Sequence, residues 1–330
     1  MSGIRDDFWR HRRVFVTGAT GFLGSWMVQE LRSSGAFVVA LVRDLPGKPT
    51  ILGTELSQPD FTVMGELEDY DCLLRTLNEY EIESVMHLAA QPIVGIALRD
   101  PRGTFETNIR GTWNLLEACR QISTVRRIVV ASTDKVYGTA DRLPCDESMP
   151  LLGRHPYDVS KSCADIIAQG YHTTYNLPVC ITRCANIYGG GDLNFSRIVP
   201  GTIQLVSHGK APVLRSDGTM IRDYIYIRDV VGGYLRLAEA MEQPEIWGHA
   251  YNFSVEKPLS VVGITEKVLI AMGRRELLPV ILNEARAEIQ EQYLSSARAR
   301  RELNWKPIHT LEESLAETVA WYRAWFVRSA

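Results

Sequence analysis

A phenol and an ammonium group lie one helical turn apart in the segment Tyr157-Asp158-Val159-Ser160-Lys161. The i,i+4 spacing places Tyr157 and Lys161 on one face of the helix that we predict over residues 156–175. A free tyrosine has a pKa of about 10, and a neighbouring cation lowers this pKa because it favours the phenolate. The pair could therefore accept a proton from a substrate. The alternative for this spacing on its own is a solvent-exposed helix face.

Three polar residues, Thr133, Asp134 and Lys135, follow an apolar run that ends at Ser132. Thr133 offers a hydroxyl at the carboxyl end of a predicted strand, which is where open α/β sheets bind their ligands. Asp134 and Lys135 add an acid and a base beside that hydroxyl. The alternative for Asp134 and Lys135 is a polar turn after a buried strand.

Glycine recurs at every third position in Thr17-Gly18-Ala19-Thr20-Gly21-Phe22-Leu23-Gly24, between a predicted strand and a predicted helix. Such a turn lets the backbone approach a pyrophosphate and points the positive end of the helix at the phosphates. The alternative is a glycine-rich turn without a ligand. We favour a dinucleotide site, with contacts from Gly18, Thr20, Gly21, Phe22, Leu23 and Gly24.

The next predicted strand ends in Leu41-Val42-Arg43-Asp44, where a dinucleotide-binding domain contacts the adenosine ribose. A carboxylate such as Asp44 favours the two ribose hydroxyls of NAD, whereas a guanidinium such as Arg43 favours the 2′-phosphate of NADP. We lean towards NADP because of Arg43 and keep NAD as the alternative because of Asp44.

The elements that must position these residues alternate between strand and helix. We predict strands over residues 13–17, 37–42, 61–64, 84–89, 127–132 and 178–183, and helices over 24–34, 69–79, 104–119 and 156–175. The strands are nearly continuous apolar runs, as in parallel sheets covered on both faces. The pattern predicts an α/β fold with a doubly wound parallel sheet, a Rossmann fold.

The character of the chain changes after residue 184. Later elements are shorter, with helices predicted over residues 260–272 and 311–325. We therefore predict a dinucleotide-binding domain over residues 1–184, to which later segments return. Residues 185–330 are expected to form mainly a smaller, interleaved substrate-binding lobe.

Composition excludes several classes of protein. The 330 residues include 36 basic and 39 acidic side chains, a net charge of −3, which argues against a nucleic-acid partner. The seven histidines show no paired ligand spacing, and no second ligand pair follows the C-x3-C pair of Cys180 and Cys184, so we predict no metal. Apolar runs fall short of the ~20 residues of a membrane span, and the charged N-terminal segment lacks a signal peptide's apolar core. We expect no membrane association and a cytoplasmic location.

Taken together, these motifs resemble the extended short-chain dehydrogenase/reductase family of nucleotide-sugar epimerases and dehydratases. Thr133-Asp134-Lys135 is similar to the Thr-Asp-Lys of CDP-glucose 4,6-dehydratases, whereas epimerases usually carry small or neutral residues after the threonine. Arg43 looks more like NADP-using GDP-mannose dehydratases and dihydroflavonol-type reductases. The resemblance extends over nearly the whole chain and includes the segments His87-Leu88-Ala89-Ala90-Gln91-Pro92, Thr107-Asn108-Ile109-Arg110-Gly111-Thr112, Asn186-Ile187-Tyr188-Gly189-Gly190-Gly191-Asp192, Arg222-Asp223-Tyr224 and Leu303-Asn304-Trp305-Lys306-Pro307.

The resemblance implies a nucleotide-sugar 4,6-dehydratase with a tightly bound NAD(P). In that reaction Tyr157, beside Lys161, removes the C4 hydroxyl proton as hydride leaves C4, and Thr133 bonds the same oxygen. Asp134 then protonates the departing C6 hydroxyl, Lys135 takes the C5 proton, and hydride returns to C6. The alternatives are an epimerase that passes through a transient 4-ketone and a reductase that consumes NADPH.

The resemblance also assigns binding residues and an assembly. Further cofactor contacts are expected from Glu66, Leu67, Ala89, Ala90, Gln91 and Asn108, besides Tyr157 and Lys161. A nucleotide-diphosphate sugar needs donors and positive charge, and the matching positions are Gln91, Thr133, Asn186, Arg197, Arg215 and Arg222. The helices over 104–119 and 156–175 are expected to form a homodimer interface.

Overall fold

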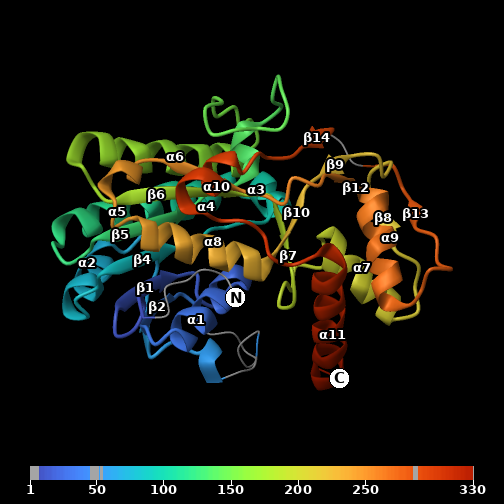
Figure 1. Ribbon diagram of the computed structural model, residues 1–330, viewed down its shortest axis with the longest axis horizontal. Helices are drawn as coiled ribbons and strands as arrows, with labels where there is room; N and C mark the ends of the chain where they lie inside the picture. The colour runs from blue at the N-terminus through green and yellow to red at the C-terminus, as the bar shows by residue number, and fades with distance from the viewer. Residues whose placement is uncertain (1–6, 45–51, 53–54, 285–288, 330) are drawn as a thin grey trace.

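Seven parallel strands form the central sheet in the order β11-β6-β5-β4-β1-β2-β3 (Figure 1). The computed structural model describes residues 7–44, 52, 55–284 and 289–329, so the first six residues of the charged N-terminal segment lie outside it. The strand bounds are Arg13–Thr17 (β1), Phe37–Val42 (β2), Phe61–Met64 (β3), Ser84–His87 (β4), Arg127–Ala131 (β5), Val179–Cys184 (β6) and Ala250–Phe253 (β11). The predicted doubly wound α/β fold is confirmed.

The chain reverses its direction of travel across the sheet at β1. It adds β2 and β3 on one side and then crosses to β4 on the other. Ligands of open α/β sheets bind at such a reversal, beyond the carboxyl ends of the strands. The predicted strand over 84–89 is two residues too long there, because the amides of Leu88 and Ala89 leave the sheet and donate to Thr17 Oγ1, each at 3.2 Å.

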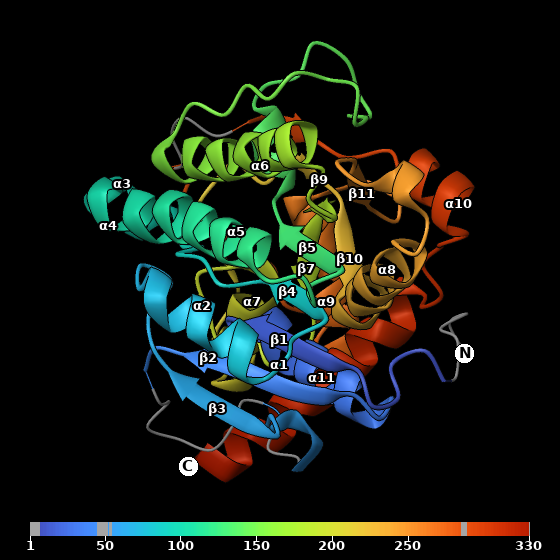
Figure 2. The ribbon, with the colours of Figure 1, turned by 90° about the vertical axis from the view of Figure 1, so that its left-hand side faces the viewer.

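Side chains of each strand alternate between the two faces of the sheet. On β1, Val14 and Val16 belong to one hydrophobic cluster and Phe15 belongs to the other. The first cluster includes residues of α1 (Phe22–Ser33) and α8 (Ile227–Ala240), and the second includes residues of α2 (Tyr70–Glu79), α5 (Gly111–Gln121) and α6 (Pro156–Tyr175). Figure 2 shows these two helix layers on opposite sides of the sheet. Burial on both faces explains the continuous apolar runs.

Strand β3 departs from this pattern. It is one of the two edge strands of the sheet, and Phe61 and Met64 are 50% and 51% exposed. The expectation that helices cover every strand on both faces is therefore wrong for β3.

The predicted helix over 104–119 is interrupted in the structure. It consists of α4 (Pro101–Phe105), a π-helical turn (Glu106–Arg110) and α5, and a short helix α3 (Val94–Arg99) precedes it. Asp100 starts α4, where its Oδ1 accepts a hydrogen bond from the amide of Gly103 at 2.9 Å. Asn108 lies in this π-helical turn, and its side chain is buried.

The C-terminal elements lie beside the sheet at its carboxyl edge (Figure 1). Three helices, α7 (Ile198–Ser207), α9 (Val261–Met272) and α11 (Leu311–Ser329), pack together there. Short strands connect them: β7 (Asn186–Tyr188) with β10 (Tyr224–Tyr226), β9 (Ile221–Arg222) between β12 (Leu259–Ser260) and β14 (Glu291–Gln292), and β8 (Val213–Leu214) with β13 (Val280–Ile281). In the part of the chain that the structure describes, no helix combines the length and apolarity needed to cross a membrane.

Two elements that the sequence analysis did not identify, α8 and β11, belong to the sheet layer. Strand β11 pairs with β6, and α8 packs against β5 and β6. The short helix α10 (Ala297–Leu303) packs beside β11. The division at residues 184 and 185 stays a prediction, with these returning segments on the sheet side.

A buried ion pair holds α6 on the sheet. Arg183 of β6 donates from Nε to Asp165 Oδ2 at 2.9 Å and from Nη2 to Asp165 Oδ1 at 3.0 Å. Its Nη1 donates to the hydroxyl of Tyr137 at 2.9 Å, and that hydroxyl donates to Asn252 Oδ1 of β11 at 2.8 Å. The side chains of Arg183 and Asp165 are 3% and 0% exposed. The pair therefore ties α6, β6 and β11 together.

Replacing Asp165 by alanine is expected to lower the free energy of unfolding by about 3–5 kcal/mol, because it leaves a buried guanidinium without its counter-charge. Chemical denaturation measures this loss. The matched control is Glu106→Ala, which breaks the exposed pair with Arg110 and should cost no more than about 1 kcal/mol. Equal losses for the two variants would contradict the role given to the buried pair.

Candidate active site

A cavity of about 670 Å³ opens at the carboxyl ends of the parallel strands, between the sheet and the C-terminal elements. Its size suits a cofactor together with part of a substrate. All five predicted catalytic residues line it. The predicted binding residues on its wall are Gly18, Thr20, Gly21, Phe22, Leu23, Gly24, Arg43, Asp44, Glu66, Leu67, Ala89, Ala90, Asn186, Arg197 and Arg222.

The glycine turn between β1 and α1 has no room for a side chain at Gly18 or Gly24. Gly18 has a φ of +71°, and a Cβ there would lie 2.7 Å from the backbone nitrogen of Ala89. A Cβ on Gly24 would lie 1.9 Å from the carbonyl oxygen of Gly18. Gly21 caps α1 without a side-chain hydrogen bond, and no acidic residue lies in the first turn. The positive end of α1 thus faces the cavity, and the turn fits the pyrophosphate of a dinucleotide.

The ends of β2 and β3 form the outer rim of the same cavity. Arg43 Nε lies 2.6 Å from Asp44 Oδ2, and both side chains are mostly exposed. Each group therefore partly neutralises the other, and both the NAD and the NADP alternatives fit this rim. Glu66 and Leu67 follow β3 on the wall beside them.

Thr133, Tyr157 and Lys161 meet at the end of β5. Thr133 and Tyr157 both line the cavity, and the Thr133 hydroxyl is among the groups that influence the protonation of Tyr157. Lys161 Nζ donates to the carbonyl of Ala131 at 2.5 Å, which fixes the ammonium at the cavity wall. Tyr157 and Lys161 come from the first two turns of α6, and Pro156 at the start of the helix favours initiation at this point.

Burial controls the protonation of this group. Burial, partly offset by Arg197 and by the Thr133 hydroxyl, raises the pKa of Tyr157 to about 12. Burial likewise lowers the pKa of Lys161 to about 8, against the effect of Asp165. The expectation that Lys161 brings the pKa of Tyr157 below its ordinary value is therefore wrong for the protein's own side chains, because loss of hydration outweighs the nearby charge.

Asp134 and Lys135 begin a 3₁₀ turn (Asp134–Tyr137) that follows β5. Thr133 Oγ1 donates to Asp134 Oδ1 at 3.1 Å and accepts from the amide of Lys135 at 3.3 Å. Lys135 Nζ lies 3.7 Å from Asp134 Oδ2. Asp134 is buried and Lys135 is half-buried. The turn thus presents an acid, a base and a hydroxyl on one part of the cavity wall.

The C-terminal elements contribute one amide and two guanidinium groups. Asn186 of β7 donates from Nδ2 to the carbonyl of Asp223 at 3.2 Å. Arg197, just before α7, lies 2.9 Å from Asp192 Oδ2. Arg222 of β9 donates from Nη1 to the carbonyl of Ile221 in its own strand at 2.8 Å. Its Nη2 donates to the carbonyl of Ile289, before β14, at 2.6 Å.

Three predicted binding residues do not line the cavity: Gln91, Asn108 and Arg215. The Gln91 side chain bonds to both the amide and the carbonyl of Ile93, so it holds the turn before α3. Asn108 accepts from the amide of Gln91 at 2.7 Å and donates to Ser160 Oγ at 2.9 Å, which connects that turn to α6. Arg215 is exposed beyond β8. Ligand contacts through these side chains are therefore not supported by their positions.

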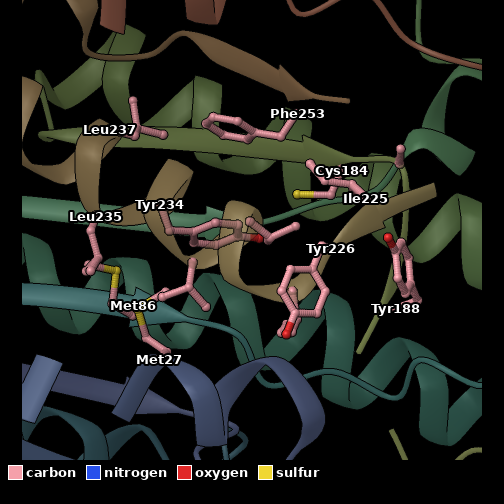
Figure 3. Packing of buried hydrophobic residues seen from close by; sticks show 14 of the residues in the cluster. Met27, Met86, Cys184, Tyr188, Ile225, Tyr226, Tyr234, Leu235, Leu237 and Phe253 are labelled. Atoms are coloured by element: carbon pink, nitrogen blue, oxygen red, sulfur yellow. The ribbon is translucent and has the colours of Figure 1, made fainter. Parts of the chain in front are cut away.

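Sequence reasoning missed several aromatic residues of the wall. Tyr188, Tyr224 and Tyr234 line the cavity, and Tyr234 of α8 lies beside Cys184, another residue of the wall (Figure 3). Tyr224 stands in a segment that the family resemblance already includes, which was a usable signal. Tyr234 lies in a helix that was not predicted, so no local pattern pointed to it.

Replacing Gly24 by alanine is expected to weaken dinucleotide binding at least about tenfold, because the added methyl group overlaps the Gly18 carbonyl and forces the turn apart. Calorimetric titration with NAD and with NADP measures this change. The control is Gly232→Ala in α8, where a Cβ meets nothing within 4 Å. That variant should bind as the unmodified protein does, and unchanged binding by Gly24→Ala would contradict the assignment.

The family profile described as GDP-mannose 4,6 dehydratase matches residues 15–318. The CDP-glucose 4,6-dehydratase of Salmonella typhimurium is 28% identical over 98% of this chain and 93% of its own length.

Two solved structures extend the comparison. The dTDP-glucose 4,6-dehydratase DesIV of Streptomyces venezuelae, solved with NAD, aligns with a TM-score of 0.82 at 28% identity, over 94% of this chain and 97% of that one. The UDP-glucose 4-epimerase of Thermotoga maritima, solved with UDP-glucose, aligns with a TM-score of 0.86 at 26% identity, over 95% and 99%. The chain therefore belongs to the GDP-mannose 4,6-dehydratase family, within the extended short-chain dehydrogenases/reductases.

Proposed function

We propose that this protein is a nucleotide-sugar 4,6-dehydratase that converts an NDP-hexose into an NDP-4-keto-6-deoxyhexose and water. The observation that carries the proposal is the cluster of Thr133, Asp134 and Lys135 with Tyr157 on one wall of the cavity. An elimination needs an acid and a base in addition to the phenol and ammonium that suffice for alcohol oxidation. The names of the relatives agree with this reaction.

The proposed cofactor is NAD or NADP, held by the glycine turn and the start of α1. Arg43 and Asp44 would meet its adenosine end, and Ala89, Ala90 and Lys161 lie further along the same wall. When bound, the nicotinamide supplies the chemistry of taking up hydride from C4 and returning it to C6.

Tyr157 is the proposed acceptor of the C4 hydroxyl proton. Tyr157 and Thr133 line the same cavity, so both hydroxyls can bond the same substrate oxygen. Lys161 remains mostly protonated at neutral pH because its pKa is about 8. Its positive charge favours the phenolate that forms when Tyr157 loses a proton.

Asp134 and Lys135 are the proposed acid and base of the elimination. Oxidation at C4 acidifies the hydrogen on C5, since the adjacent ketone can accept the electron pair. Lys135 then removes the C5 proton, the C6–O bond breaks, and Asp134 gives a proton to the departing oxygen, which leaves as water. The 3.7 Å between the two groups suits neighbouring positions on C5 and C6.

The C-terminal lobe is the proposed binding site for the nucleotide diphosphate. Arg197 and Arg222 supply positive charge and Asn186 supplies an amide donor on the cavity wall. We also propose a homodimer through α5 and α6, which expose apolar residues such as Trp113 and Ile166. A cytoplasmic location stays a prediction.

An epimerase acting through a transient 4-ketone is the second candidate. It is favoured by the similarity to the UDP-glucose 4-epimerase structure, and it would leave Asp134 and Lys135 with a structural role only. The product distinguishes the two candidates, because an epimer keeps the oxygen on C6.

We expect the protein to remove one water from at least one of four substrates: a CDP-, GDP-, dTDP- or UDP-hexose. Mass spectrometry of the products measures the loss, and the amounts of oxidised and of reduced cofactor should each be the same after turnover as before it. An isomer of unchanged mass would support the epimerase, and stoichiometric consumption of NADPH would support the reductase. Either result would refute the dehydratase.

Replacing Lys135 by methionine is expected to slow product formation at least about a hundredfold, because the C5 proton loses its base. Oxidation at C4 should continue, so the absorbance of reduced nicotinamide should rise and persist after substrate is added. Lys210→Met, at an exposed lysine, is the control and should leave both rates unchanged. Normal product formation by Lys135→Met would remove Lys135 from the mechanism.

A further inference from the structure

A buried carboxamide from the far end of the chain bridges the turn that carries Asp134 and Lys135. Gln292 of β14 donates from Nε2 to the backbone carbonyl of Asp134 at 2.8 Å. Its Oε1 accepts a hydrogen bond from Lys135 Nζ. Gln292 is 1% exposed and is absent from the cavity wall. It therefore contacts the proposed base from behind and does not touch the substrate.

The backbone that carries Gln292 is held on both sides. Strand β14 pairs with β9 so that Gln292 stands opposite Arg222. One residue further on, the amide of Cys145 donates to the carbonyl of Tyr293 at 2.9 Å, and the amide of Ser295 donates to the carbonyl of Cys145 at 2.8 Å. The carboxamide thus has a fixed place from which to hold a flexible side chain.

Arg222 fixes the residues that precede β14. Its Nη2 donates to the carbonyl of Ile289 at 2.6 Å, and its Nη1 donates to the carbonyl of Gln290 at 3.2 Å. Arg222 itself lies on the cavity wall. The segment that positions Gln292 is therefore built into the lobe that we propose for substrate binding.

A neutral acceptor suits a lysine that must give up its proton. A lysine side chain has many rotamers, and one hydrogen bond to a fixed acceptor removes much of that freedom in advance. A carboxylate in the same place would hold the ammonium as well but would add a negative charge that favours its protonated form. Among the described residues, Asp134 on the same turn and Asp158 on α6 place negative charge near Lys135, so a carboxylate at position 292 would add a further negative charge.

We infer that Gln292 is a positioning residue for the elimination step: its carboxamide orients Lys135 Nζ and the Asp134 backbone without adding charge. The inference rests on the proposed dehydratase function. It assigns a role in the mechanism to a residue 157 positions away in sequence from the base that it orients.

The first test is Gln292→Leu in the holoenzyme, with a nucleotide hexose that the unmodified protein dehydrates. Release of the 4-keto-6-deoxy product should slow at least about tenfold, since the base loses its fixed position. Reduced nicotinamide should accumulate during the reaction, because the groups that oxidise C4 are untouched. Parallel loss of C4 oxidation and product formation would indicate a merely structural role and overturn the inference.

The second test is Gln292→Glu, which keeps the shape and the acceptor. The pH at which elimination reaches half of its maximal rate should move upwards by about one unit or more, because the added carboxylate favours protonated Lys135. The pH dependence of C4 oxidation should not move. An unshifted elimination profile would overturn the inference even if the variant were slower.

The control is Gln290→Leu, whose side chain is exposed and donates to Thr219 at 3.0 Å. It should match the unmodified protein in both rates and in the pH profile, and an effect as large as that of Gln292→Leu would overturn the inference. Failure of the proposed function would be seen separately, as the absence of water loss by the unmodified protein with every hexose tested.

Discussion

The bidentate pair of Asp165 and Arg183 is the contact on which the active site depends most. Helix α6 carries both Tyr157 and Lys161, and the pair anchors that helix to β6 from within the core. A salt bridge in this position adds little net stability compared with apolar packing, but neither partner can be lost without leaving a bare charge. Its geometry therefore constrains how α6 lies, and with it the direction of the phenol and the ammonium.

The polar groups around Lys161 are arranged so that its ammonium is the positive charge there and the nearby histidine is neutral. His87 is buried between Thr17 and Thr112, with hydrogen bonds of 2.8 Å and 3.0 Å. Burial, with the added effect of Lys161, lowers the pKa of His87 to about 3, so the imidazole is neutral. The imidazole of His87 therefore places no second positive charge beside Lys161. The buried relay from Asn108 through Ser160 to the Tyr157 carbonyl fixes the start of α6 without any further charge.

Two distant parts of the chain share the site. The sheet and its helices supply the glycine turn and the reactive side chains at the carboxyl ends of β1 and β5. Segments after β6 add Asn186, Arg197 and Arg222 to the wall and Gln292 behind it. Since β14 bonds to β9 on one side and to the turn after β5 through Gln292 on the other, the binding lobe and the elimination turn form a continuous bonded unit.

The sequence alone determined what depends on neighbouring residues. Apolar runs marked six of the seven strands, glycine spacing marked the turn before α1, and the i,i+4 spacing placed Tyr157 and Lys161 on one face of α6. Tertiary structure decided the rest. It raised the pKa of Tyr157 where the sequence suggested a fall, because hydration is lost only when the fold closes over the hydroxyl.

The same holds for individual positions. Gln91 and Asn108 look like ligand contacts by motif, yet the fold uses their amides to join the turn before α3 to α6. The return of α8 and β11 to the sheet, and the approach of Gln292 to Lys135, had no local signal. Such contacts join residues that are far apart in the chain, and packing and burial set their free energy. Periodicity and turn chemistry, in contrast, act over a few residues.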